Sequence, residues 1–452
     1  MAILRLRYVF VIVFGTVVSP FLIFWVWSSI ESARLERTFD ALEARNEPLD
    51  IATFDSKPTT DEQRQASHYY KQAASLVAEL KPRSLTEAGK VIEEYCGTSD
   101  PVMRRERATS LESLEGQYRG ALDLLDRASS LDANGWDAAD KPSRYSIEAN
   151  LPYELAGVNA VRIARLACSG DGEAAGNALL ASLRLRRILP TWATRPLQTS
   201  HSLQLVLQAG VSPPLLQQLQ QEYQRLADAP GLDVSLQHAR AQWLYFAEPG
   251  VFSDPPQGFE GRRMTPFEAI AMRLMRPARD HVAVSELREF NEVIDAMKQP
   301  WPQKLEAARA IGTRYPRSSN RGSLASALMP FGRHAASFSL QVYVTTMAEA
   351  LARTRASIGA LAAARWMATH GGALPASLND LNPQYVSAPL ADPYSGGPLN
   401  YIQHGRAYKI YSVGTNGRDD GGMWEQHSDL QFTRRGDPLD VGIAVRESPQ
   451  SP

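Results

Sequence analysis

The chain has 452 residues, of which 44% are hydrophobic and 21% are charged, a composition typical of folded globular domains and unlike that of disordered chains. Its 48 basic and 49 acidic side chains leave a formal net charge of -1. Without a basic excess there is no global field to attract nucleic acid, so we expect no nucleic-acid partner.

The first element is an apolar segment from Tyr8 to Trp27 that contains no charged residue. At about 1.5 Å per residue, such a helix spans the roughly 30 Å hydrocarbon core of a bilayer. Trp25 and Trp27 stand where an interfacial aromatic belt is expected. We therefore predict an N-terminal transmembrane helix, with residues 1–30 forming a cytoplasmic tail and a single membrane anchor. A cleaved signal peptide is the alternative.

The residues that flank this segment bear on its orientation. Arg5 and Arg7 precede it, and Arg34 and Arg37 follow it, so the basic residues on its two sides nearly balance. A short basic tail before an apolar run is nevertheless typical of a signal anchor. The sequence thus favours a single-pass protein of the bacterial inner (cytoplasmic) membrane, with everything from residue 31 onward outside the cytoplasm.

The chain contains two cysteines, Cys96 and Cys168. A disulfide between them would suit an extracytoplasmic location. Two separate buried thiols are the alternative and the preferred interpretation, because two cysteines do not define a disulfide framework.

Between residues 60 and 230, apolar side chains recur every three or four positions, which predicts a series of amphipathic helices. The first follows the capping-box pair Thr60 and Gln63 and stops before Pro82. Others are expected over residues 111–128, on both sides of residues 169–172, and from Ser212 to Leu226. Short connections make antiparallel neighbours, so we predict an irregular helical bundle or array. A tetratricopeptide solenoid is less favoured, because no fixed-period repeat is found.

The C-terminal third has a different pattern. Residues 301–337 are expected to be a linker or hinge after an extracytoplasmic helical domain over 31–300, because proline, glycine and serine cluster there. A long alanine-rich helix is predicted to end at Gly371. A tight turn and two antiparallel strands should follow, over residues 399–402 and 408–413. The fold class is thus mainly α, ending in a small α+β module over 338–435 and a disordered tail over 436–452.

This order of elements resembles the globular part of the major pseudopilin of type II secretion systems. The chain also resembles uncharacterised bacterial membrane-anchored proteins with the same ending. The matching residues are Leu374, Pro375 and Leu378 after the helix, Asp392, Pro393, Tyr394 and Gly396 in the turn, and Ser412, Gly414, Asn416 and Gly417 after the second strand. The resemblance implies a pilin-like module with a long helix packed on a short sheet.

Calcium binding is implied by the same resemblance, because these pseudopilins hold the ion in their final loop. The corresponding residues are Asp419 and Asp420, with Asn416, in a glycine-rich segment that can turn carbonyl groups toward a cation. A solvated turn, in which the aspartates accept hydrogen bonds from local backbone N–H groups, is the alternative. In a pseudopilin the apolar helix runs directly into the module, whereas about 300 residues intervene here, so filament assembly is not expected.

No catalytic motif stands out, although distant residues can converge in a fold and the question of an enzyme stays open. The chain has no His-Glu-x-x-His pair, no Gly-x-Ser-x-Gly elbow and no phosphate-binding loop. We therefore predict an extracytoplasmic scaffold or interaction protein with envelope partners, linked to a secretion or pilus-like apparatus. The alternative is an envelope hydrolase with its site between the helical domain and the module. A scaffold should expose a large apolar patch, and a hydrolase should gather titratable groups in a pocket.

Overall fold

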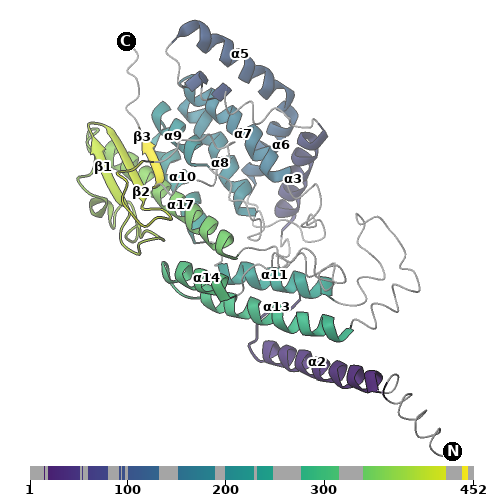
Figure 1. The fold of residues 1–452 in the computed structure, drawn as a ribbon. Coiled ribbons are helices and arrows are strands. Elements are labelled where there is room, and N and C mark those ends of the chain that lie inside the picture. The colour runs from purple at the N-terminus through teal and green to yellow at the C-terminus, as the bar shows by residue number, and fades with distance from the viewer. Residues whose placement is uncertain are drawn as a thin grey trace, which may run out of the picture. The chain divides into compact units, whose positions relative to one another are not determined.

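The computed structural model describes residues 15, 19–50, 53, 60–79, 91–92, 94–96, 100–131, 151–188, 199–228, 232–247, 276–314, 340–423 and 440–445. In these residues helices predominate, and three strands form one antiparallel sheet in the order β1-β2-β3 (Figure 1). The chain divides into two compact units. Unit 1 comprises residues 1–54, 232–298 and 308–340, and unit 2 comprises residues 55–231, 299–307 and 341–452.

Unit 2 contains the helical array and the C-terminal module. Its helices are α3 (Asp61–Glu79), α5 (Pro101–Gln117), α6 (Arg119–Ser130), α7 (Leu151–Cys168), α8 (Gly172–Ile188), α9 (Ser200–Ala209), α10 (Pro213–Ala227) and α17 (Leu340–Thr369), followed by the short 3-10 helix η5 (Leu378–Leu381). Its strands are β1 (Asn400–His404), β2 (Ala407–Ser412) and β3 (Val441–Val445).

Local signals placed several of these helices where the sequence predicted them. The backbone N–H of Gln63 donates to the Thr60 hydroxyl at 3.2 Å, so the predicted cap starts α3. At the end of α17, Gly371 and Gly372 adopt φ values of 63° and 86°. Gly372 N then donates to the carbonyl of Met367 at 2.9 Å. This pattern is a glycine-dependent helix stop, as predicted for Gly371.

One of the two hydrophobic clusters in the described part of unit 2 includes residues of both the helical array and the C-terminal module. Leu183 of α8, Leu219 of α10, Leu361 of α17 and Ile410 of β2 are all fully buried members of it. The expected boundaries, 31–300 for a helical domain and 338–435 for a module, therefore do not coincide with the compact units. Packing against α17 joins the helical array to the C-terminal module. No local pattern in the sequence predicts such long-range packing.

The long helix α17 lies directly on the sheet. A Cβ atom at Gly359 would approach Leu390 Cδ1 to 2.9 Å and Ile410 Cδ1 to 3.1 Å, so the glycine lets α17 pack closely on these two side chains. At the next residue, the buried Tyr408 hydroxyl donates to the carbonyl of Ala360 at 3.0 Å. The predicted helix-on-sheet arrangement is confirmed in this respect.

The sheet contains a strand that we did not predict. Residues Val441 to Val445, expected in a disordered tail, form β3 and pair antiparallel with β2, Ile443 lying opposite Ile410. Every residue of β3 is buried. At Gly442 an added Cβ would lie 2.3 Å from the carbonyl oxygen of Ile410, so the glycine allows close approach of the two strands. A short apolar run of this kind has no periodicity that would identify it as a strand.

Unit 1 is built from α2 (Ser19–Glu43), α11 (Leu232–Ala247) and α13 (Arg276–Met297), with α13 packed against both of the others. Helix α14 (Gln303–Arg314) occupies part of the predicted 301–337 linker, and the division between the units falls within it. The rest of that linker lies outside the described residues.

The predicted fold class needs one correction. Among the helices that the structure describes, none is long and apolar enough to cross a bilayer. Much of the segment from Tyr8 to Trp27 lies outside the described residues, and its described end belongs to α2. Beyond Ile30 that helix carries charged residues and packs along α13. The prediction of an N-terminal transmembrane helix is therefore wrong, because the described helix at this end of the chain does not stay apolar over the length that a bilayer requires.

Candidate functional site

The Asp-Pro-Tyr-Ser turn of unit 2 is organised around Asp392, which is 1% exposed. Its Oδ1 accepts hydrogen bonds from Ser412 Oγ at 2.6 Å and from the backbone N–H of Tyr394 at 2.8 Å. Its Oδ2 accepts from Ser395 Oγ and from the backbone N–H of Val413, both at 3.1 Å. One carboxylate thus joins the turn to the end of β2, and two segments that carry the pseudopilin resemblance meet in space.

The positively charged side chain of Arg355 lies close to this carboxylate. Arg355 of α17 donates from Nη1 to the carbonyl of Ala391 at 2.7 Å. Burial lowers the pKa of Arg355, and the charge of Asp392 opposes that shift. The guanidinium therefore partly compensates a buried negative charge. This arrangement positions the loop after β2 but presents no free reactive group.

The residues of the predicted calcium loop, here the acidic loop (residues 416–422), lie together after β2. Asn416 Nδ2 donates to Asp420 Oδ2 at 2.7 Å. Asp419 Oδ1 accepts from the Tyr411 hydroxyl at 2.9 Å and from a backbone N–H of the loop. Loop-internal hydrogen bonds therefore occupy several of the oxygens that would bind a cation.

Sequence analysis missed a fourth member of this group, Asp440, which directly precedes β3. It is 2% exposed, and its Oδ2 accepts from the backbone N–H groups of Gly422 at 2.8 Å and Asp420 at 3.1 Å. Its Oδ1 is buried and has no hydrogen-bond partner among the residues that the structure describes. Burial raises the pKa of Asp440, the two backbone N–H groups oppose this, and the charges of Asp420 and Asp419 add to the rise. Sequence analysis could have found Asp440 only if it had predicted the strand β3.

The chemistry of these residues fits a hard cation, because their side chains supply oxygen ligands and Asp440 Oδ1 has no hydrogen-bond partner in the described part of the chain. As the described residues are placed, however, no three acidic, histidine or cysteine side chains form a group that could hold a metal. Calcium would have to draw Asp440 and the loop carboxylates closer together.

The two cysteines are joined in the structure. The Sγ atoms of Cys96 and Cys168 are 2.14 Å apart, as in a disulfide. The bond links the helical stretch before α5 to the last residue of α7, across 72 positions of sequence. It therefore anchors a segment that lies between α3 and α5 to the main core of unit 2.

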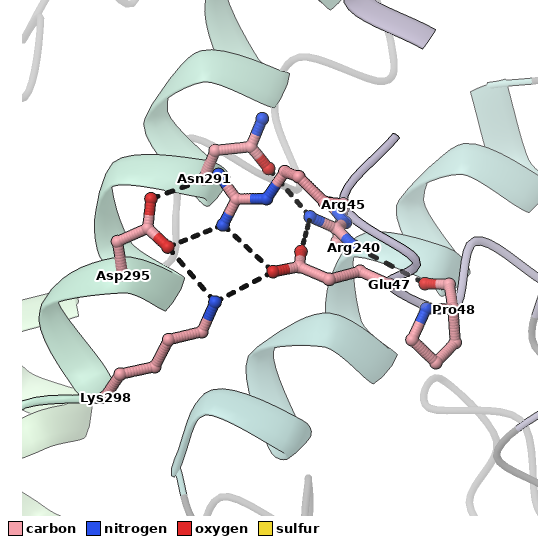
Figure 2. Close-up of polar contacts among 7 residues, drawn as sticks. All are labelled: Arg45, Glu47, Pro48, Arg240, Asn291, Asp295 and Lys298. Atoms are coloured by element: carbon pink, nitrogen blue, oxygen red, sulfur yellow. Dashed lines mark hydrogen bonds and ion pairs between the residues drawn. The ribbon is translucent and has the colours of Figure 1, made fainter. Parts of the chain in front are cut away.

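Unit 1 contains an ion-pair network that the sequence did not reveal (Figure 2). At its centre, Arg240 of α11 is fully buried and donates from Nη1 to Glu47 Oε2 at 2.8 Å and to Asn291 Oδ1 at 2.7 Å. Arg45 contacts the other oxygen of Glu47 at 2.9 Å, as does Lys298 Nζ. The segment that follows α2 is thereby held against α11 and α13.

The outer part of the network is more exposed. Asp295, 51% exposed, accepts from Arg45 Nη2 at 2.5 Å and from Lys298 Nζ at 3.2 Å. Burial alone would raise the pKa of Glu47, but hydrogen bonds from Arg45, Lys298 and Arg240 outweigh it and lower this pKa to about 2. The network is therefore a structural clamp around an ionised Glu47.

The N-terminal half of α2 presents large apolar side chains to solvent. Phe21 is 71% exposed, Ile23 is 67% exposed and Trp25 is 62% exposed, whereas Leu42 near the other end of the helix is fully buried. Four further side chains are 41% to 48% exposed: Leu22, Val26, Trp27 and Ile30. We refer to these seven residues as the exposed apolar surface of α2. Exposed apolar surface of this extent on one element is typical of an interaction site.

Comparison with known proteins adds no assignment to these features. No family model, curated protein or solved structure matches the chain.

Proposed function

We propose that this chain is an interaction protein that holds a partner through the exposed apolar surface of α2. The observation that carries this proposal is the exposure of seven large apolar side chains on one helix. Burying such side chains contributes about 25 cal/mol per Å² of apolar area, which strongly favours a covered state. A scaffold function requires an exposed patch of this kind.

The distribution of the exposed side chains around the axis of α2 indicates what kind of partner surface could cover them. Successive residues of a helix are rotated by about 100° around its axis. Leu22 and Ile23 therefore face different directions, as do Trp25 and Val26. One partner helix would cover only one side of this surface. We therefore propose that the partner offers an apolar groove or several apolar helices, which surround α2.

The disulfide supports a place outside the cytoplasm for this interaction. Disulfides persist in oxidising compartments such as the bacterial periplasm and are rare in the cytosol. The bond between Cys96 and Cys168 is therefore consistent with an extracytoplasmic scaffold of the bacterial envelope. The resemblance of the C-terminal module to pseudopilins supports a partner in a secretion or pilus-like apparatus.

The hydrolase alternative is supported less well. A hydrolase needs titratable groups that converge where substrate can reach them. In the described part of the chain, the most concentrated charged groups of unit 1 are ion pairs closed on one another, such as Glu47 with Arg240. Asp392 is likewise enclosed by its own hydrogen-bond donors.

The interaction can be tested by photocrosslinking in the bacterial cell. A photoreactive phenylalanine analogue at Phe21 or Trp25 should crosslink the full chain to an envelope protein, through a peptide of an apolar helix identified by mass spectrometry. The same analogue at Glu36, an exposed polar position of the same helix, should give little product. No protein crosslink at either aromatic position would refute the proposal. A product formed only with a second copy of this chain would replace the envelope partner by self-association.

We also propose that calcium binds the acidic loop, with ligands from Asp419, Asp420, Asn416 and Asp440. A saturating ion at about 100 times its dissociation constant should raise the free energy of unfolding by about 2.7 kcal/mol. Thermal melting of the full chain with calcium, with magnesium and with a chelator measures this effect. Asp440→Asn should abolish the calcium response, whereas Asp123→Asn, on the exposed side of α6, should keep it. Identical melting curves with calcium and chelator would rule the ion out.

A further inference from the structure

The acidic loop begins with an asparagine–glycine pair, Asn416 and Gly417, that water can reach. Asn416 is half-buried, and both Gly417 and the next residue, Arg418, are exposed. In such a pair the backbone nitrogen of the glycine can attack the side-chain carbonyl carbon of the asparagine, because glycine has no Cβ to hinder the approach. The loop therefore contains the two residue types that this intramolecular reaction requires.

Two hydrogen bonds hold the side-chain amide of Asn416 in place. Its Oδ1 accepts from the backbone N–H of Arg418 at 2.9 Å, and its Nδ2 donates to Asp420 Oδ2 at 2.7 Å. The bond from Arg418 folds the amide back over the peptide of Gly417, which favours the approach of the reacting atoms. The same N–H stabilises the negative charge that develops on Oδ1 when Cγ is attacked.

The attacking nitrogen is only weakly held. The backbone N–H of Gly417 donates to the carbonyl of Gly414 at 3.3 Å, beyond the usual range of about 2.7–3.2 Å for such bonds. Gly417 has a φ of 67°, which glycine adopts without steric cost. The nitrogen can therefore leave its present acceptor and turn toward Cγ of Asn416 at little cost.

We propose that Asn416 is a site of spontaneous deamidation, at which the acidic loop acquires a third carboxylate beside those of Asp419 and Asp420. The Gly417 nitrogen gives its proton to solvent and forms a bond to Cγ. The bond from Cγ to Nδ2 breaks, and Nδ2 takes up a proton and leaves as ammonia. Water then opens the resulting succinimide ring at either carbonyl, which gives aspartate or isoaspartate at position 416. The reaction consumes one water and involves no oxidation or reduction.

The new carboxylate changes the chemistry of the loop. The Nδ2 donor to Asp420 is lost, and a negative charge replaces it. The affinity of a calcium site rises with the number of its charged ligands, so we expect conversion to aspartate to tighten calcium binding about tenfold. This consequence rests on the calcium site proposed above, whereas the deamidation itself does not.

Peptide mapping by mass spectrometry detects the reaction in the full-length protein, as the mass change of an amide that becomes an acid. One sample is aged folded and another in guanidinium, both at mildly alkaline pH. Asn416 should convert in the folded protein at least as fast as in the denatured chain, whereas Asn400, which precedes Tyr401 within β1, should stay intact. Gly417→Ala should slow the conversion at least about tenfold in both samples, because its Cβ hinders the attack. Conversion confined to the denatured chain, or undiminished in Gly417→Ala, would overturn the proposal.

Calcium titration by isothermal calorimetry tests the consequence separately. Asn416→Asp reproduces the aspartate product and should bind calcium about tenfold more tightly than the parent protein. Asn379→Asp adds the same charge at an exposed position of η5, outside the loop, and should leave the dissociation constant unchanged. Equal affinities of the two variants would overturn the tightening. If neither the parent nor Asn416→Asp binds calcium, the calcium site fails, and the mass spectra still decide whether Asn416 deamidates.

Discussion

Replacing Asp392 by alanine is expected to lower the stability of the C-terminal sheet by about 3–5 kcal/mol. The substitution leaves the Ser412 hydroxyl and the backbone N–H groups of Tyr394 and Val413 without their acceptor. It also removes the negative charge near the half-buried Arg355. Hydrogen exchange of the β2 amides in the full-length protein measures the loss, because exchange reports the free energy of local opening.

Two further variants test how the Asp392 carboxylate stabilises the turn. Asp392→Asn keeps one acceptor oxygen and the side-chain volume, so we expect about half the loss seen with alanine. Asp380→Ala removes another acidic residue of the module, one that caps the short helix η5, and should cost only about 1 kcal/mol. If Asp392→Ala costs no more than Asp380→Ala, Asp392 does not organise the turn.

Replacing Glu47 by alanine is expected to destabilise unit 1 by about 3–5 kcal/mol, because it leaves the fully buried Arg240 without its carboxylate. Hydrogen exchange of α11 and α13 amides measures this effect. Asp295→Ala provides the matched control. It removes the other carboxylate of the same network, but at an exposed position, where an ion pair contributes about 1 kcal/mol or less.

A double substitution tests why Glu47→Ala destabilises unit 1. Removing both partners, with Glu47→Leu and Arg240→Leu together, leaves no buried unpaired charge, so the double variant should be more stable than Glu47→Ala alone. A double variant that is less stable than the single one would mean that packing of the two long side chains, and not charge pairing, holds the segment after α2.

The same network predicts how acid affects unit 1. The pKa of Glu47 is about 2 in the folded protein, below its ordinary value of 4.5. A carboxylate with a lowered pKa stabilises the fold above its unfolded pKa, and this contribution is lost as the pH falls. The Glu47 contribution should therefore be complete above about pH 4.5 and disappear toward pH 2. Glu47→Gln should lack this part of the pH dependence in thermal melts.

Sequence reasoning succeeded where structure depends on neighbouring residues. The capping pair Thr60 and Gln63, the glycines after α17 and the apolar spacing of α10 act within one or two helical turns, so their effects can be read locally. The same reasoning failed at the N-terminus, because an apolar run does not reveal that its helix continues along a partner helix such as α13. It also missed β3, which is too short for its period to be recognised.

The sequence by itself determined the helical class of the protein, its turns and the residues of the acidic loop. Only the tertiary structure decided which side chains share one environment. Asp392 meets Ser412 across 20 positions, and Glu47 meets Arg240 across 193. Asp440 joins the acidic loop because β3 pairs with β2. Periodicity and capping act between near neighbours along the chain, whereas pairing of buried charges depends on how distant segments pack, which no local pattern encodes.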